Sequence, residues 1–243
     1  MSDPIADPPT PTLRDHARTA ANAAISAIPV VGSPLEILIG DVLRPNLERR
    51  RTAWLGELAS VVQELQAQMG DARLEALVDD DAFVDAVLQA SMIAMGTTIE
   101  AKIAMLRAVL VNVGSAHVDR DLLTSRFLGL VAELELEHFV VLAYGADPKA
   151  FEVDETPAAE TPLSRLRRAD VAIDSRLIDL LTHDLEVRGL IDGRYLRKVA
   201  MSAESVQPFV TVLGQHLLDF VSYFEVVAPV LSDEFREPDA PPG

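Results

Sequence analysis

The chain contains no cysteine, which excludes disulfide bonds, thiolate metal ligands and cysteine nucleophiles. Aromatic residues make up only 5% of the 243 residues, although 49% are apolar. The core must therefore consist mainly of Leu, Val, Ala, Ile and Met. A composition rich in Ala and Leu favours helices, because these side chains lose little rotamer freedom there.

Signals for secretion or membrane insertion are also lacking. The first residues, MSDPIADPPTP, have neither the basic segment nor the apolar segment of a secretory signal. No uninterrupted apolar run reaches the roughly 20 residues that a membrane span needs. The most apolar stretch, residues 24–43, is interrupted by Pro29, Pro34, Glu36 and Asp41. These features predict a cytoplasmic protein.

The formal net charge is −17. A field of this sign repels nucleic-acid phosphates and anionic membranes unless a local basic patch overrides it. Gly32 and Gly40 have neither the spacing of a dinucleotide-binding loop nor a following Lys-Ser/Thr pair. We therefore expect no cofactor.

The pattern predicts a mainly α protein with two parts. An N-terminal helical bundle with long helices occupies residues 13–151, and a small winged-helix-like α+β module occupies residues 163–231. The acidic, proline-containing segment EVDETPAAETP, residues 152–162, is typical of a linker. Residues 1–12 and 232–243 are rich in proline and acid, so we expect a disordered N-terminus and a flexible tail.

Long runs of apolar residues at helical spacing define the predicted bundle. Asp79-Asp80-Asp81 is typical of a helix start, since acidic groups are favoured at the positive end of a helix. One long helix is predicted from there to Gly114, with a bend at Gly96. A further helix is predicted from Asp119 to Gly145.

The C-terminal module is predicted from a change of pattern. Leu177, Ile178, Leu181 and Leu185 form the apolar face of a helix. The following segment RYLRKVAM (Arg194–Met201) is the best strand candidate, and Val206–Val210 is expected to return as a second strand. A last helix runs through Phe220, which gives the order of a winged helix.

A basic cluster opens the long helix before Gly70: Arg44, Arg49, Arg50 and Arg51. Trp54, the only tryptophan, follows one turn after Arg50 and Arg51, where cation–π contact is possible. The functional interpretation is a site for an anionic partner, either a lipid headgroup or nucleic acid. The alternative, favoured by the acidic composition, is a solvated helix face paired with acidic neighbours.

A second basic group lies on the predicted wing. Arg194, Arg197 and Lys198 could contact DNA phosphates there. Acidic residues on the preceding helix, Asp179, Asp184 and Glu186, disfavour an approach to DNA.

Glu135 and His138 match the Glu-x-x-His spacing of di-iron helical bundles. Such sites require a second copy of this motif and further glutamates, and the sequence has no second copy. The favoured interpretation is that His138 caps, hydrogen-bonds or packs within a helix face. No metal site and no catalytic residue are predicted.

Several segments carry a family resemblance. The segment PLEILIGDVLRPNLERRRTAWLGEL resembles the Pro-Leu-Glu-x-Arg-Arg-x-x-Trp region of a group of uncharacterised bacterial all-helical proteins. The similarity continues through FVDAVLQASMIAM, EAKIAMLRAVLVN, EHFVVLAYG, DLEVRGLI and VTVLGQHLLDFV, and so covers nearly the whole chain. Asn46, after Pro45, departs from the pattern.

More distantly, the order of segments resembles the abortive-infection alpha group of bacterial defence proteins. This resemblance implies a role in phage defence and supplies no enzymatic residues. The resulting hypothesis is a non-enzymatic, cytoplasmic interaction protein whose N-terminal apolar helices dock on the bundle or are released.

A protein partner is the favoured partner class, with self-association and peripheral membrane contact as alternatives. A winged-helix regulator that binds DNA through the C-terminal module is the alternative function.

Overall fold

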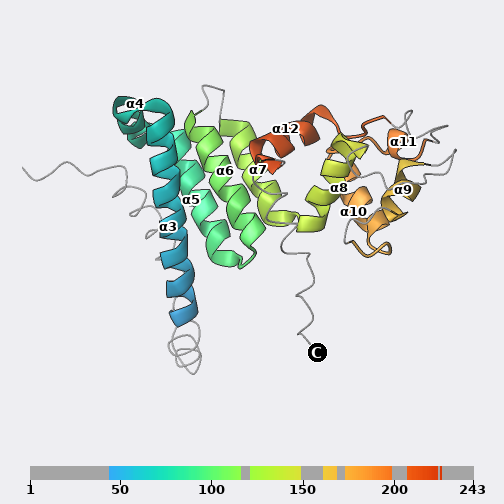
Figure 1. Cartoon of the computed structure of the whole chain (residues 1–243), viewed down its shortest axis with the longest axis horizontal. Helices are drawn as coiled ribbons and strands as arrows, with labels where there is room; N and C mark the ends of the chain where they lie inside the picture. The colour runs from blue at the N-terminus through green and yellow to red at the C-terminus, as the bar shows by residue number, and fades with distance from the viewer. Residues whose placement is uncertain are drawn as a thin grey trace, which may run out of the picture. The chain divides into compact units, whose positions relative to one another are not determined.

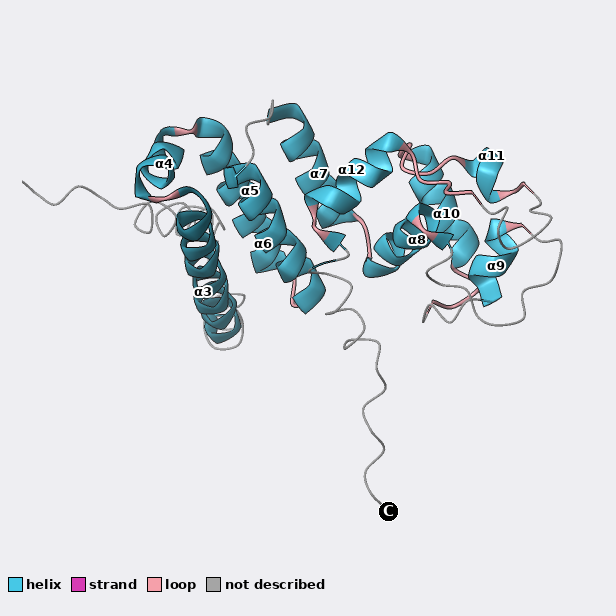
Figure 2. Cartoon of the chain, turned by 45° about the horizontal axis from the view of Figure 1, so that its top comes forward, coloured by secondary structure: helices cyan, strands magenta, loops and turns pink. Residues whose placement is uncertain are grey.

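The computed structural model of the chain describes residues 44–115, 121–148, 161–168, 173–198, 207–223 and 225 (Figure 1). Its elements are α3 (Arg44–Met69), α4 (Asp71–Ala76), η2 (Leu77–Asp79), α5 (Asp81–Gly96), α6 (Glu100–Ser115), α7 (Asp121–Glu133), α8 (Leu136–Ala146), α9 (Pro162–Arg168), α10 (Ile178–Val187), α11 (Gly193–Leu196) and α12 (Val212–Phe220). The predicted mainly α class is confirmed, and the described residues form no strand (Figure 2).

Several predicted features lie outside the described residues. These are the disordered start at 1–12, the apolar helices before Arg44, most of the linker 152–162 and the tail 232–243. None of the helices in the described part of the chain has the length and apolar character needed to cross a membrane.

The chain divides into two compact units. The first contains residues 1–99 and 109–128, and the second contains residues 100–108 and 129–243.

The first unit has α3 packed against α5. The buried face of α3 follows helical spacing and consists of Trp54, Leu58, Val61 and Leu65. The buried face of α5 is mostly small: Phe83, Ala86, Val87, Ala90, Ser91 and Ala94. The large side chains of α3 thus pack against mostly small side chains of α5. Large residues facing small ones let the two helices fill the core at close packing with few aromatic residues.

The start of α5 is fixed by a side-chain cap. The carboxylate of Asp80 accepts hydrogen bonds from the backbone N–H groups of Ala82, at 3.1 Å, and Phe83, at 3.4 Å. Such a cap satisfies donors that have no partner within the helix. The predicted start signal at this acidic triplet is confirmed.

Each of the two long helices predicted after Asp81 is divided in the structure. The first ends at Gly96, because Thr97 is extended and its side-chain oxygen accepts from the N–H of Ile99 at 3.1 Å. The second divides at Leu134 and Glu135, between α7 and α8. Apolar spacing persists across both breaks, so spacing alone does not reveal them.

The second unit is organised around α8, which has nine buried residues. Both α10 and α12 pack against α8, and α11 contacts α9 and α10. Phe209 anchors the segment before α12: its N–H donates to the carbonyl of Gly145 at 2.9 Å, and its ring lies against the same glycine.

The prediction of a wing, a pair of strands after α10, is wrong for the residues that the structure describes. Residues 194–196, expected in a strand, belong to the short helix α11, whose start is capped by the Asp192 carboxylate accepting from the N–H of Arg194 at 3.0 Å. An Asp-Gly pair that caps a helix turn competes directly with strand formation.

The described part of the expected return strand Val206–Val210, residues 207–210, forms one antiparallel bridge, between Val210 and Ile191. Two backbone hydrogen bonds flank this bridge, from Asp192 to Phe209 at 2.7 Å and from Thr211 to Leu190 at 2.9 Å. The segment thus pairs with residues that precede the predicted first strand. The part of the winged-helix prediction that rests on a hairpin is therefore incorrect.

Candidate functional site

His138 lies at the start of α8 and is buried, with 6% of its surface exposed. Its Nδ1 accepts a hydrogen bond from the backbone N–H of Glu135 at 3.1 Å. A nitrogen that accepts this bond carries no proton, so the proton of the neutral ring is on Nε2. His138 therefore caps its own helix, which confirms the interpretation favoured from the sequence.

The other ring nitrogen faces α10. Nε2 lies 3.6 Å from Oδ2 of Asp184. Burial lowers the pKa of His138 below its usual value, although the Asp184 carboxylate acts in the opposite direction. The imidazole therefore lies between a backbone donor and a carboxylate.

Ion pairs extend this cluster on both sides. Arg188 lies 3.4 Å from Asp184 and 3.6 Å from Glu133, and the buried amine of Lys102 lies 3.9 Å from the carboxylate of Glu135. Because Nδ1 accepts the N–H of Glu135 and Nε2 carries the proton, the neutral ring has no free lone pair that could take a proton from a substrate.

Glu135 and His138 do not converge on one point as metal ligands. Glu135 precedes α8, and its carboxylate lies near Lys102. Within the described ranges, His, Asp and Glu form no group of three or more that could hold a metal ion. The Glu-x-x-His spacing here fixes a helix start.

Three of the four arginines in the cluster on α3 are bonded within the protein. The side chain of Arg44 is outside the part of the chain that the structure describes. Arg49 donates to Asn46, Arg50 donates to the carbonyl of Met95 at 3.1 Å, and Arg51 lies 3.6 Å from Glu48. Because Met95 stands in the last turn of α5, Arg50 places a positive charge at the negative end of that helix.

Trp54 is not available to a ligand. Only 2% of its surface is exposed, and its indole N–H donates to the hydroxyl of Ser91 at 2.9 Å. The structure thus joins Arg50 and Trp54 to α5, which favours the interpretation that this cluster stabilises the fold.

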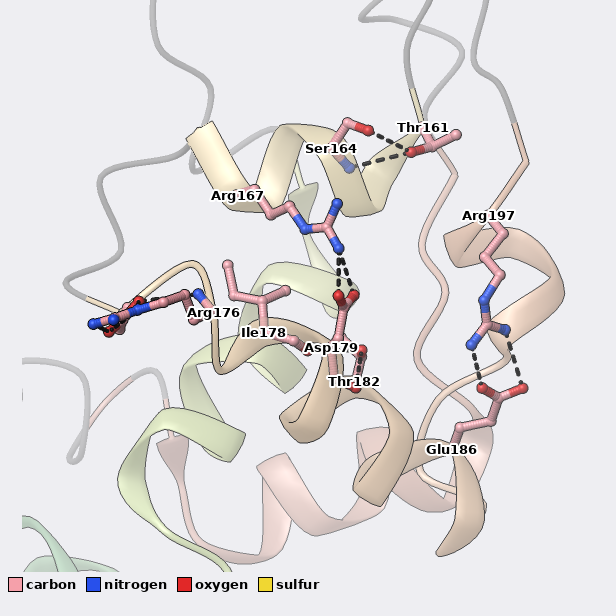
Figure 3. Close-up of polar contacts among 10 residues, drawn as sticks. Thr161, Ser164, Arg167, Arg176, Ile178, Asp179, Thr182, Glu186 and Arg197 are labelled. Atoms are coloured by element: carbon pink, nitrogen blue, oxygen red, sulfur yellow. Dashed lines mark hydrogen bonds and ion pairs between the residues drawn. The ribbon is translucent and has the colours of Figure 1, made fainter.

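The basic residues predicted on the wing have partners as well. Arg194 binds Asp192 at 2.7 Å. Arg197 binds Glu186 of α10 at 2.9 Å, as Figure 3 shows. The amine of Lys198 lies 5.9 Å from the centre of the Tyr195 ring. The two ion pairs lower the charge that Arg194 and Arg197 present to a phosphate.

The feature that sequence reasoning missed is the outer face of α10. Leu177, Leu180 and Val187 are 44%, 60% and 70% exposed. At about 100° per residue these positions fall within about 80° of one another on the helix. We call these three residues the α10 stripe. Leu180 and Val187 are apolar but do not lie on the helix face formed by Ile178, Leu181 and Leu185. Their position could have indicated from the sequence that α10 has exposed apolar side chains.

Ion pairs lie beside the α10 stripe and within it. On one side, Arg167 of α9 binds both carboxylate oxygens of Asp179 at 2.6 Å, and Arg197 binds Glu186 (Figure 3). Asp184, which pairs with Arg188 at 3.4 Å, lies between Leu177 and Leu180 on the helix, within the stripe. The exposed side of α10 therefore combines apolar side chains with ion-paired charges, and protein-binding surfaces contain both kinds of group.

Neither the protein-family models, nor the curated proteins, nor the solved structures compared with this chain include a match.

Proposed function

We propose that this protein is a non-enzymatic helical interaction protein that binds a partner protein through the α10 stripe. The observation that carries the proposal is the exposure of Leu180 and Val187 on a helix whose opposite face is fully packed. Burying a leucine or valine side chain contributes about 1.5–3 kcal/mol, so such side chains supply binding energy when a partner covers them.

The polar clusters support the non-enzymatic part of the proposal. Nδ1 of His138 accepts the backbone N–H of Glu135, Nε2 is buried 3.6 Å from the Asp184 carboxylate, and burial lowers the pKa of the ring. A general base needs a nitrogen that can reach its substrate. Nucleophilic catalysis would also require a nucleophile beside such a base, and the contacts of His138 described above include none.

The biological setting we propose is bacterial defence against phage, in the cytoplasm. It rests on the order of segments, which is a glycine-containing apolar segment, an arginine cluster, long helices and a terminal helix, and which resembles that of the abortive-infection alpha group. In this setting the chain is an accessory or effector that recognises another protein of the defence response.

The test places a photo-crosslinking phenylalanine derivative at Leu180 in the full chain, inside bacteria challenged with phage. Val212, on α12 and 74% exposed, is the matched control position. We expect a discrete protein adduct at 180 that the substitution Val187→Ser diminishes, and no corresponding adduct at 212. Equal adducts at both positions, or none at 180, contradict the proposal.

The defence role has its own measurement, which is phage plating efficiency. Cells that carry the unchanged chain or Val212→Ser should be protected, and cells that carry Leu180→Ser with Val187→Ser should lose protection. Absence of protection by the unchanged chain would remove the defence setting.

A further inference from the structure

We propose that His138 is a pH-sensitive cap of α8: proton uptake at Nδ1 releases the backbone N–H of Glu135 and strengthens the contact between the ring and Asp184 of α10. The proposal goes beyond the proposed function, because it concerns a conformational change within the second unit and requires no partner protein. It follows from the bond at one ring nitrogen, the missing bond at the other, and the charges linked to both.

In the neutral ring, one nitrogen is satisfied and the other is not. Nδ1 accepts the backbone N–H of Glu135 at 3.1 Å, so the proton of the ring is on Nε2. Nε2 is buried and has no hydrogen-bond partner among the described residues, since the Asp184 carboxylate at 3.6 Å is too distant. A buried donor without an acceptor disfavours the state that contains it. The neutral state therefore keeps the cap and leaves the Nε2 proton unsatisfied.

The protonated ring reverses this pattern. Its second proton is on Nδ1 and points at the N–H of Glu135, so two donors face each other and the cap is lost. At Nε2, the positive ring gains a charge-assisted contact with Asp184, which a shift of less than about 1 Å brings within hydrogen-bonding distance. Each protonation state thus satisfies one ring nitrogen, and the added proton decides which of the two contacts forms.

Five charged groups of the second unit are linked to His138 through the contacts described above. They are Lys102 on α6, Glu133 and Glu135 at the junction of α7 and α8, and Asp184 and Arg188 on α10. Three carboxylates and two cations give this cluster a charge of −1, which proton uptake by the ring brings to zero. Asp184 favours the charged ring and Arg188 opposes it.

Other titratable groups on the two helices that pack against α8 are exposed or bound elsewhere. They are Asp179 and Glu186 of α10, which bind arginines, and His183 of α10 and His216 and Asp219 of α12, which are exposed. Protonation of His183 or His216 therefore changes no buried contact, in contrast to protonation of His138.

Loss of the cap opens the junction of α7 and α8. At this junction the N–H of Leu134 still donates to Leu130 of α7, at 2.9 Å, and α8 begins after Glu135. Without its acceptor, the Glu135 N–H is unpaired and the first turn of α8 frays. The Glu135 carboxylate then leaves Lys102, whose side chain is only 8% exposed. This cost keeps the junction closed while the ring is neutral, and the charged contact with Asp184 offsets it at acidic pH.

The experiment is an NMR titration of the isotope-labelled full chain from about pH 8 to about pH 4.5, a range that spans the ordinary pKa of histidine. Long-range correlations between ring protons and ring nitrogens report which nitrogen carries a proton. The amide signal of Glu135 and its exchange protection report the cap.

We expect a protonated Nε2 and an unprotonated Nδ1 at pH 8. Proton uptake at Nδ1 should then have its midpoint below the ordinary value, because burial lowers the pKa of His138. The Glu135 amide should lose its exchange protection with the same midpoint. Circular dichroism should stay nearly constant over this transition, since only the first turn of α8 changes.

Three variants separate the cap from other pH effects. In His138→Gln, the side-chain oxygen can accept the same N–H but takes up no proton, so the Glu135 amide should show no transition. Asp184→Asn should move the midpoint by about 1 pH unit to lower pH, because the charged ring loses its partner. His183→Gln, at an exposed position of α10, should leave the midpoint unchanged.

Several results overturn the proposal. They are a proton on Nδ1 at pH 8, no proton uptake by the folded ring down to about pH 4.5, or a Glu135 amide that stays protected while the ring titrates. The same amide transition in His138→Gln, or a higher midpoint in Asp184→Asn, also contradicts it. Loss of the whole helical signal at the midpoint would show global unfolding in place of a local opening, and this result too overturns the proposal.

Discussion

The indole N–H of Trp54 donates a hydrogen bond of 2.9 Å to the hydroxyl of Ser91, and the same hydroxyl donates to the carbonyl of Val87 at 2.7 Å. Both residues are buried, on α3 and α5 respectively. One serine thus satisfies the only polar atom of the largest side chain in the core, and it joins the two helices.

Replacement of Ser91 by Ala should destabilise the protein by about 1–3 kcal/mol, since the indole N–H then remains buried without an acceptor. Urea unfolding followed by tryptophan fluorescence measures this loss. Ser125→Ala is the matched control, because Ser125 is exposed and bonded only to the Gln89 side chain. We expect a change within about 0.5 kcal/mol for the control, and equal losses for the two variants would contradict the role given to Ser91.

Stability should fall as the pH decreases below the ordinary pKa of histidine. Burial lowers the pKa of His138 in the folded chain, whereas unfolding restores a value of roughly 6.5. Below that pH the unfolded chain binds a proton that the folded chain does not. The free energy of unfolding therefore decreases by up to about 1.4 kcal/mol per pH unit from this group, until the pH passes the folded pKa.

Urea unfolding at a series of pH values from about 8 to about 5 tests this dependence. His138→Gln should flatten the decrease, because it removes the buried titrating group. The exposed His183 provides the control, and His183→Gln should retain the slope. An unchanged slope in His138→Gln would rule out this histidine as the source.

Two glycines should respond to alanine with opposite signs. A Cβ on Gly214 would overlap the backbone carbonyl of Leu190 and come within 2.6 Å of the Val210 side chain. Gly214→Ala should therefore cost about 1–3 kcal/mol by overpacking. Gly56, within α3, has no atom within 4 Å of an added Cβ. Gly56→Ala should stabilise the helix by about 0.5–1 kcal/mol, and thermal melting of both variants measures the contrast.

Arg50 should contribute to stability and Arg49 should not. Arg50 donates to the carbonyl of Met95 across the two helices, whereas Arg49 donates to Asn46 within its own exposed turn. Arg50→Ala should lose about 1 kcal/mol, and Arg49→Ala should change stability by less than about 0.5 kcal/mol. Chemical denaturation of both variants decides between this structural role and a site for an anionic partner, for which the two substitutions would leave stability alike.

Local sequence signals were sufficient where a residue acts on its near neighbours. The acidic triplet around Asp80 marks a helix start because a carboxylate reaches the N–H groups two and three positions later. The favoured interpretation of His138 as a cap holds for the same reason. In the C-terminal part, the alternation in RYLRKVAM was weaker than the cap that Asp192 provides, so a helix turn forms at residues 193–196 instead of a strand.

Composition and helical spacing determined that this protein is mainly α, because Ala, Leu and Val at such spacing bury one face of each helix. Tertiary structure decided which polar groups meet. The pairing of Trp54 with Ser91, of Arg50 with Met95 and of Arg197 with Glu186 joins residues 37, 45 and 11 positions apart. Tertiary packing also decided that Leu180 and Val187 remain exposed, since only the arrangement of α8 beside α10 selects the face of α10 that is buried.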